Sequence, residues 1–136
     1  MNTIRTLVAL AAIAPALATS AAAQQMTYPD KCRSEMSSGG DMSMQGHQMS
    51  GMAEFQKESM DGMKAMNMNM IGMMKKDADV AFACGMIAHH MGAISMAKVE
   101  LKYGDNAETK AKAQKIIDDQ TKEIKELTTW VEKEAK

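Results

Sequence analysis

The chain has 136 residues, with 16 Lys or Arg against 17 Asp or Glu and a formal net charge of −1 at pH 7. This balance, without a basic block, argues against nucleic acid or an anionic membrane as partner, and the length suits one domain. Methionine is the anomaly, because 17 methionines accompany an aromatic content of 4%. A core built mainly from such flexible side chains would be poorly specified, so the sulfur calls for a second explanation.

Residues 1–23 have the pattern of a secretory signal peptide. Arg5 precedes an apolar run from Leu7 to Ala18, and small residues follow at the expected cleavage site. The apolar run is shorter than the ~20 residues that span a membrane, and we expect no later segment to span one. The sequence therefore predicts an exported, periplasmic protein.

Residues 24–50 are polar and rich in Gly, Ser, Gln and Met, which predicts a flexible Met/His-rich arm. Thioethers and one imidazole lie close together around the end of this arm, where no core is expected for them to fill. The candidate metal ligands there are Met44, His47, Met49 and Met52. The alternative is a biased tail whose methionines serve as sacrificial oxidation targets.

Cys32 and Cys84 are the two cysteines of the chain, and export would place both in an oxidising compartment. Two interpretations stay open. The cysteines form a disulfide, or Cys84 stays a free thiolate that helps to bind a soft metal, since it lies a few residues before a histidine pair.

Residues 51–136 form the predicted helical domain, with three helices separated by breaks at residues 75–77 and 104–106. In the first helix, apolar residues fall on one face at helical spacing. The stripe consists of Met52, Phe55, Met63, Met66, Met70, Met73 and Met74. Taken alone such a stripe is more typical of core packing than of a metal site, although Met63, Met66, Met70 and Met73 are also candidate ligands.

The second helix carries a regular apolar stripe with His90 in its middle and ends before Gly104. The third helix begins with an expected capping box at Asp105 and Glu108, and Gln120 is the one polar centre of its stripe and a candidate partner for His90. Three helices with short connections predict an all-α, small antiparallel bundle. A fourth helix would come from the arm or from a second copy in a homodimer.

The middle of the second helix concentrates the expected metal chemistry. Met86 lies one turn before His90 and three residues before His89, so both rings reach the neighbourhood of one thioether. Met96 follows His89 by seven residues on the same face, and Met91 lies on the opposite flank. Copper(I) and silver(I) prefer thioether and imidazole donors. This combination favours a soft-metal site over simple packing.

The segment 79–130 resembles the DUF305 family. The matching residues are Asp79, Phe82, Met86, His89, His90, Gly92, Ala93, Met96 and Ala97, then Ile116, Ile117, Gln120, Glu123, Ile124 and Trp130. The resemblance implies a ferritin-like bundle of three to four helices and a role in extracytoplasmic copper or silver binding and tolerance. The sequence departs from the common family string at Ala88, where proline is frequent, and at Met91, where glutamine is frequent.

We therefore expect a periplasmic copper(I)- and silver(I)-binding protein, not an enzyme, that acts in metal buffering, trafficking or tolerance. Another periplasmic copper protein or an efflux component would exchange metal with it. The alternative is a Met-lined helical interaction module that binds an apolar peptide or partner helix without metal. A copper redox enzyme would need an open coordination position and a substrate pocket, and the sequence reveals neither.

Overall fold

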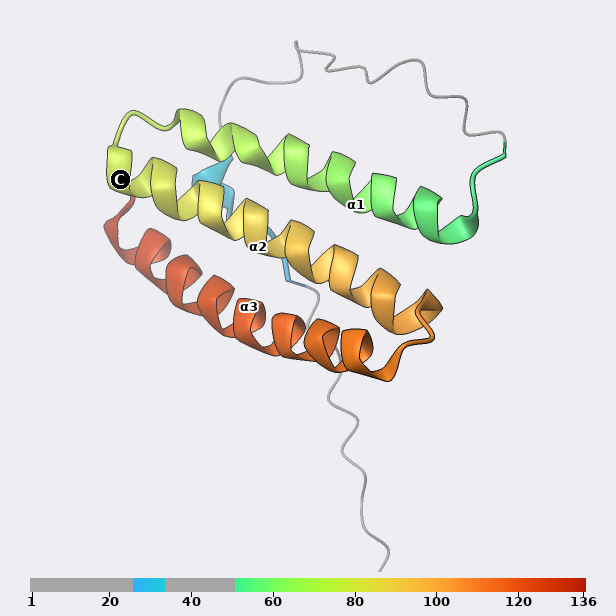
Figure 1. Ribbon diagram of the computed structural model, residues 1–136. Helices are drawn as coiled ribbons and strands as arrows, with labels where there is room; N and C mark the ends of the chain where they lie inside the picture. Colours follow the sequence, from blue (N-terminus) through green and yellow to red (C-terminus); the bar gives the residue numbers. More distant parts are fainter. Residues whose placement is uncertain (1–25, 34–50) are drawn as a thin grey trace, which may run out of the picture.

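A computed structural model describes residues 26–33 and 51–136 of the protein. Its helical elements are η1 (Asp30–Cys32), α1 (Glu54–Asn69), η2 (Met70–Met74), α2 (Ala78–Tyr103) and α3 (Ala107–Glu134). The three long helices run antiparallel in succession, with α1 and α3 on opposite sides of α2 (Figure 1). The predicted all-α class and small helical bundle are confirmed. The expected signal peptide, most of the expected arm, and Met44, His47 and Met49 lie outside the described residues.

Side chains before α2 and α3 define where these helices begin. The Asp77 carboxylate accepts hydrogen bonds from the backbone N–H groups of Asp79 and Val80, both at 3.0 Å, as a helix N-cap does. Asn106 caps α3 in the same way. The expected capping box at Asp105 is therefore one residue too early, because the amide of Asn106 is the group that reaches the free N–H groups.

The core lies mainly between α2 and α3, as their apolar stripes predicted. The buried residues of α2 include Val80, Ala83, Ile87, His90, Ile94 and Ala97, and those of α3 are Ala113, Ile124 and Val131. Ile117 and Leu127 pack against this core while partly exposed. Gly104 ends α2 as predicted, with extended backbone.

The first predicted helix differs from its expectation in two ways. It is α-helical only to Asn69 and continues as the tighter 3-10 helix η2. In η2, Gly72 is buried against the Tyr28 hydroxyl and the Cys84 side chain. In addition, no residue of α1 is fully buried, and Met63 is 47% exposed. The methionine stripe is therefore not fully buried, although Met70 packs against the core and Met66 fills the notch at Gly92 of α2.

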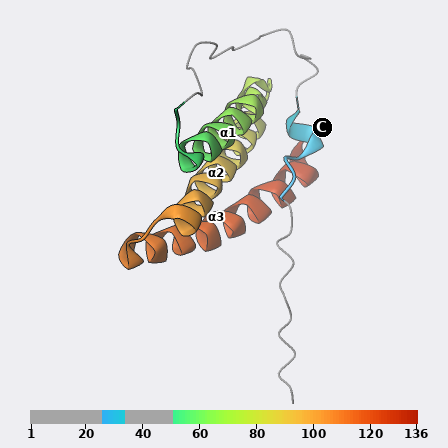
Figure 2. The same ribbon diagram turned by 90° about the vertical axis from the view of Figure 1, so that its right-hand side faces the viewer.

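Residues 26–33 form a packed segment, here called the N-terminal strap, which lies beside the C-terminal end of α3 (Figure 2). Cys32 forms a disulfide with Cys84 of α2, so the free-thiolate interpretation is wrong. The Tyr28 hydroxyl donates to the Cys84 carbonyl at 3.1 Å. The Lys31 ammonium donates to the Glu132 and Ala135 carbonyls, both at 2.8 Å, which satisfies backbone acceptors at the end of α3.

Helix α2 is long and apolar enough to cross a membrane by length and composition alone. This differs from the expectation that no segment after the signal peptide would be. Of an apolar stretch of 18 residues in α2, 56% is buried inside the protein, because α1 and α3 pack on α2 from both sides. Burial within the fold thus accounts for the apolar character of α2.

Candidate metal site

His90 is the buried polar residue at the centre of the candidate site. It comes from the middle of α2 and is only 5% exposed. Its Nε2 lies 2.8 Å from a carboxylate oxygen of Glu123 on α3. The pair thus joins the two helices that form the core. A carboxylate oxygen at this distance faces a ring nitrogen that carries a proton. In the neutral imidazole the single ring proton therefore lies on Nε2.

The other ring nitrogen of His90, Nδ1, is buried and has no hydrogen-bond partner among the residues that the structure describes. With the proton on Nε2, Nδ1 presents a lone pair. A buried polar atom without a partner normally requires a water molecule, an ion or another ligand. Histidines that bind metals commonly donate their second ring N–H to a carboxylate, which orients the ring and raises its basicity. The His90–Glu123 pair has this arrangement.

An open groove between α2 and α3 gives access to this region. Its volume is about 490 Å³, and we call it the histidine groove. It is lined by Phe82, Met86, His90, Glu123, Glu126, Leu127 and Trp130. The predicted pairing of Met86 with His90 therefore holds at the level of the groove, which offers a thioether and an imidazole beside two carboxylates.

His89 points away from the core, unlike its neighbour. It is exposed, and its ring centroid lies 5.8 Å from that of His90. Gly85 and Gly92 flank it by one turn on either side, and α1 and η2 place methionines against both glycines. A Cβ at Gly85 would lie 3.3 Å from the Met73 sulfur, and one at Gly92 would lie 2.5 Å from the Met66 sulfur.

These contacts give Met66 and Met73 two properties at once. Their side chains fill the notches left by glycines, which is packing, and those glycines lie within one helical turn of the exposed His89. Gly85 and Gly92 are seven residues apart, about 10 Å along the helix, so the two sulfurs lie at separate positions. Met73 and Met66 therefore contact α2 on either side of His89 along the helix.

The remaining predicted methionines are not brought together with His90. Met91 and Met70 are half-buried and pack against the core. Met96 is 55% exposed and lines a different groove of α2 and α3. Met52 precedes α1 and is partly buried, and Met63 is exposed on α1. Within residues 26–33 and 51–136, no three His, Cys, Asp or Glu side chains gather as a metal site. This statement concerns His, Cys, Asp and Glu and does not include the thioethers of methionine.

Glu123 is the residue of α3 that pairs with His90. Gln120, the expected partner, leaves its Oε1 buried and without a hydrogen bond. Both residues lie on the face of α3 toward α2, three positions apart, so helical periodicity alone does not choose between them. The register of α3 against α2 makes the choice.

Comparison with family models gives one match. The model described as "Domain of unknown function (DUF305)" matches residues 9–131 of the chain. No curated protein matches it.

Proposed function

The chain belongs to the DUF305 family, and on that premise we propose that it binds copper(I), or silver(I), through methionine and histidine side chains. The proposed role is metal buffering, trafficking or tolerance in the periplasm, by a binding protein rather than an enzyme. Copper is the cargo, and another periplasmic copper protein or an efflux component would supply or remove it.

The observation that carries the proposal is the state of the two ring nitrogens of His90. Nε2 is held by the Glu123 carboxylate at 2.8 Å, and Nδ1 is buried without a partner. A soft cation at Nδ1 would satisfy this atom. The ring is already oriented by its carboxylate, which reduces the reorganisation needed on binding.

The donors that line the histidine groove fit a soft, monovalent cation. The Met86 thioether lines the same groove, and copper(I) and silver(I) accept imidazole and thioether in small coordination numbers. Zinc and calcium would need more imidazole, thiolate or clustered oxygen donors. The string around His89 and His90 also resembles that of the periplasmic copper-binding protein CopM, which favours the same chemistry.

The exposed His89 supplies a second place where metal could bind. Met73 and Met66 contact the glycines one turn before and one turn after it, and Met73 is 52% exposed. Such a site would exchange metal quickly, whereas the buried His90 nitrogen would hold it longer. Capture at His89 followed by retention at His90 is consistent with buffering.

Trp130 provides a direct measurement of the His90 site. It is the only tryptophan of the chain and it lines the histidine groove. Titration of the metal-free protein with silver(I), which needs no reductant and leaves the disulfide intact, should give a saturable change in Trp130 fluorescence. The change should require at least about tenfold more silver in Glu123→Gln, because loss of a carboxylate behind a ligand histidine typically weakens binding 10- to 100-fold.

Glu126→Gln is the matched control, because Glu126 lines the same groove while its carboxylate pairs with Lys122 of the same helix, at 3.9 Å. Its silver affinity should match that of the unmodified protein. Native mass spectrometry of the same samples would count the bound ions, with more than one expected. The proposal would be refuted if the protein bound neither silver(I) nor copper(I) at micromolar concentration. It would also be refuted if His90→Gln and Glu123→Gln both left the silver affinity unchanged.

A second candidate function is the Met-lined interaction module, favoured by the exposed apolar side chains of α1 and η2. Met68 is 68% exposed and Met74 is 71% exposed, and adaptable methionine surfaces suit partner helices. This function predicts partner binding that is unchanged by metal chelators and by His90→Gln.

A further inference from the structure

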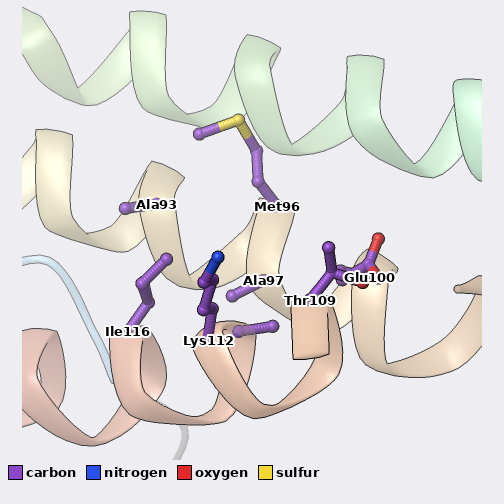
Figure 3. A pocket seen from close by; sticks show the side chains of 8 residues that line it. Ala93, Met96, Ala97, Glu100, Thr109, Lys112 and Ile116 are labelled. Carbon is purple, nitrogen blue, oxygen red and sulfur yellow. Dashed lines mark hydrogen bonds between the residues drawn. The ribbon is translucent and has the colours of Figure 1, made fainter. Parts of the chain in front are cut away.

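Two grooves follow one another between α2 and α3, and helical periodicity places their lining residues on one face of each helix. The first is the histidine groove. The second, which we call the lysine groove, has a volume of about 270 Å³. It is lined by Ala93, Met96, Ala97, Glu100, Thr109, Lys112, Ala113 and Ile116. Figure 3 shows Met96 rising from α2 toward α1, with Ile116 and Lys112 reaching up from α3.

Large apolar side chains are exposed around both grooves. Phe82 is 65% exposed and Trp130 is 38% exposed beside the histidine groove, and Met96 and Ile116 are 55% and 41% exposed in the lysine groove. Single exposed apolar residues are ordinary on a protein surface, but a continuous row of them marks an interaction site.

The two grooves differ in charge, because the histidine groove is acidic and the lysine groove holds one cation and one anion. The histidine groove has the carboxylates of Glu123 and Glu126. In the lysine groove, the Lys112 ammonium is the cation. The carboxylate there, Glu100, already accepts a hydrogen bond from the Thr109 hydroxyl at 2.7 Å. Lys112 pairs with Glu108 in an exposed contact within α3, and such contacts are weak enough to be exchanged for another partner.

We propose that a second copy of this chain covers this face in a two-fold symmetric dimer, with the helices of the two copies antiparallel across the interface. A two-fold axis across the helices, between the two grooves, places the lysine groove of each copy on the histidine groove of the other. Each contact is then made twice, as in isologous dimers. The opposite arrangement, with the axis along the helices, would set the carboxylates of Glu123 and Glu126 against themselves.

Charge and apolar character then match in the same register. Lys112 of one copy would meet Glu126 or Glu123 of the other, while Met96 and Ile116 would cover Phe82 and Trp130. The apolar contact supplies the burial, and the ion pairs fix the orientation, which is the usual division of roles in interfaces. The inference does not depend on metal binding, since every group in it belongs to the chain.

Sedimentation equilibrium of the metal-free protein from micromolar to millimolar concentration tests the proposal. We expect a monomer–dimer equilibrium that Lys112→Glu weakens at least tenfold, and that Glu126→Lys weakens similarly. The double variant Lys112→Glu/Glu126→Lys should restore association, because the two-fold axis brings the exchanged charges together again. Trp130 fluorescence should shift to shorter wavelength as the dimer forms, because the indole loses contact with water.

Lys115→Glu is the matched control, because Lys115 is an exposed lysine of α3 that lines neither groove. It should leave the equilibrium unchanged, and circular dichroism should show equal helix content in all variants. A monomer at every concentration overturns the proposal, and the face would then belong to another segment of this chain or to a different protein. A dimer that is unaffected by both single charge reversals, or not restored by the double variant, overturns it as well.

Discussion

The phenol of Tyr28 is a polar group held inside a small core. The side chain is 5% exposed, and its hydroxyl donates to the Cys84 carbonyl. Burial raises the pKa of Tyr28 from 10.0 to about 12, because the charged phenolate loses hydration. The folded state therefore favours the neutral phenol more strongly than the unfolded state does. This contribution to stability is fully present below pH 10 and is lost as the pH rises toward 12.

We predict that the free energy of unfolding falls between about pH 10 and about pH 12, and falls less in Tyr28→Phe, which has no phenol to ionise. Urea unfolding followed by circular dichroism at several pH values measures this. Parallel pH curves for Tyr28→Phe and the unmodified protein would contradict the prediction.

At the scale of single residues, the sequence identified part of the candidate site. Met86 and His90 lie in one groove as predicted, because both are on one helix and their spacing alone places them together. The contact of Glu123 with His90 depends on how far α3 slides along α2, which helical periodicity alone does not determine. Met91 lies on the same flank of α2 as Cys84. This flank packs against the core and the strap, which separates Met91 from the histidine groove.

At the scale of elements, the two helices with regular apolar stripes were predicted well. The stripes of α2 and α3 are the faces that meet in the core. The strap could not be foreseen, because its polar, short sequence has no periodicity, and only its cysteine hinted at a fixed position. The methionine stripe of the first predicted helix packs on α2, because Met66 and Met73 fill glycine notches there, but no residue of α1 is fully buried.

Gly72 is where η2, α2 and the strap approach most closely. A Cβ at this position would lie 2.0 Å from the Tyr28 hydroxyl oxygen and 2.8 Å from the Cys84 Cβ. Neither atom is free to move, because Cys84 is tied by the disulfide and Tyr28 is buried. We predict that Gly72→Ala destabilises the fold by about 1–3 kcal/mol, the usual range for overpacking, as measured by chemical denaturation.

Gly85→Ala is the matched substitution on the other side of the contact. The atoms that its Cβ would meet belong to Met73, a flexible side chain that is 52% exposed and can rotate away. In the middle of α2, alanine also favours the helix over glycine by about 1 kcal/mol. Gly85→Ala should therefore be neutral or slightly stabilising. Equal losses of stability for the two variants would contradict the prediction. They would show that the space around Gly72 is no more restricted than the space around Gly85.

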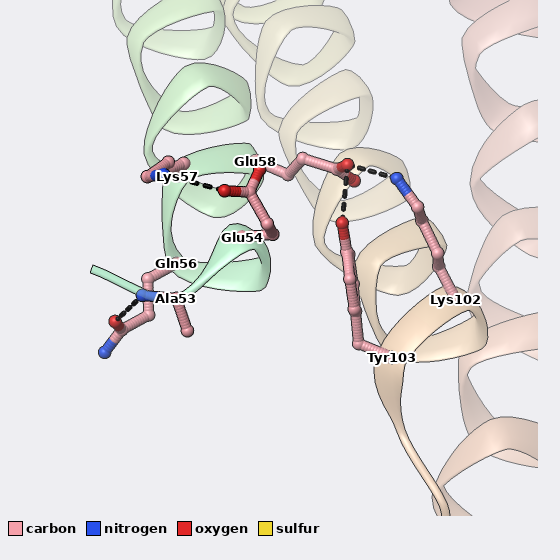
Figure 4. Close-up of polar contacts among 7 residues, drawn as sticks. All are labelled: Ala53, Glu54, Gln56, Lys57, Glu58, Lys102 and Tyr103. Carbon is pink, nitrogen blue, oxygen red and sulfur yellow. Dashed lines mark hydrogen bonds and ion pairs between the residues drawn. The ribbon is translucent and has the colours of Figure 1, made fainter. Parts of the chain in front are cut away.

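At the scale of the whole molecule, the helices differ in how firmly they are held. Helix α2 packs on both α1 and α3, and α3 shares the core with it. Helix α1 has no buried residue, so contacts near its two ends carry more of its attachment. One end continues into η2 beside the disulfide. At the other end, the Glu58 carboxylate accepts hydrogen bonds from Lys102 and Tyr103 of α2 (Figure 4).

These hydrogen bonds, first from Lys102 and then from Tyr103, hold the pKa of Glu58 below its ordinary value of 4.5. The folded state thus favours the carboxylate, and the contact contributes above pH 4.5 and is lost as the pH falls through the lowered pKa. Glu54 is a useful comparison, because its carboxylate pairs with Lys57 inside α1 alone and does not join two helices.

We predict that hydrogen exchange at neutral pH is slowest in α2, faster in α3 and fastest in α1. Glu58→Gln should speed exchange several-fold in the first turns of α1 and the last turn of α2, because it removes the charged acceptor that joins them. Glu54→Gln should leave α2 unchanged. After correction for the intrinsic exchange rate, the effect of Glu58→Gln should vanish in acid. The Glu58 carboxyl of the unmodified protein is then neutral, as the glutamine amide is. If α1 is as protected as α2, or if Glu54→Gln loosens both helices equally, α1 is held by its whole length rather than by its ends.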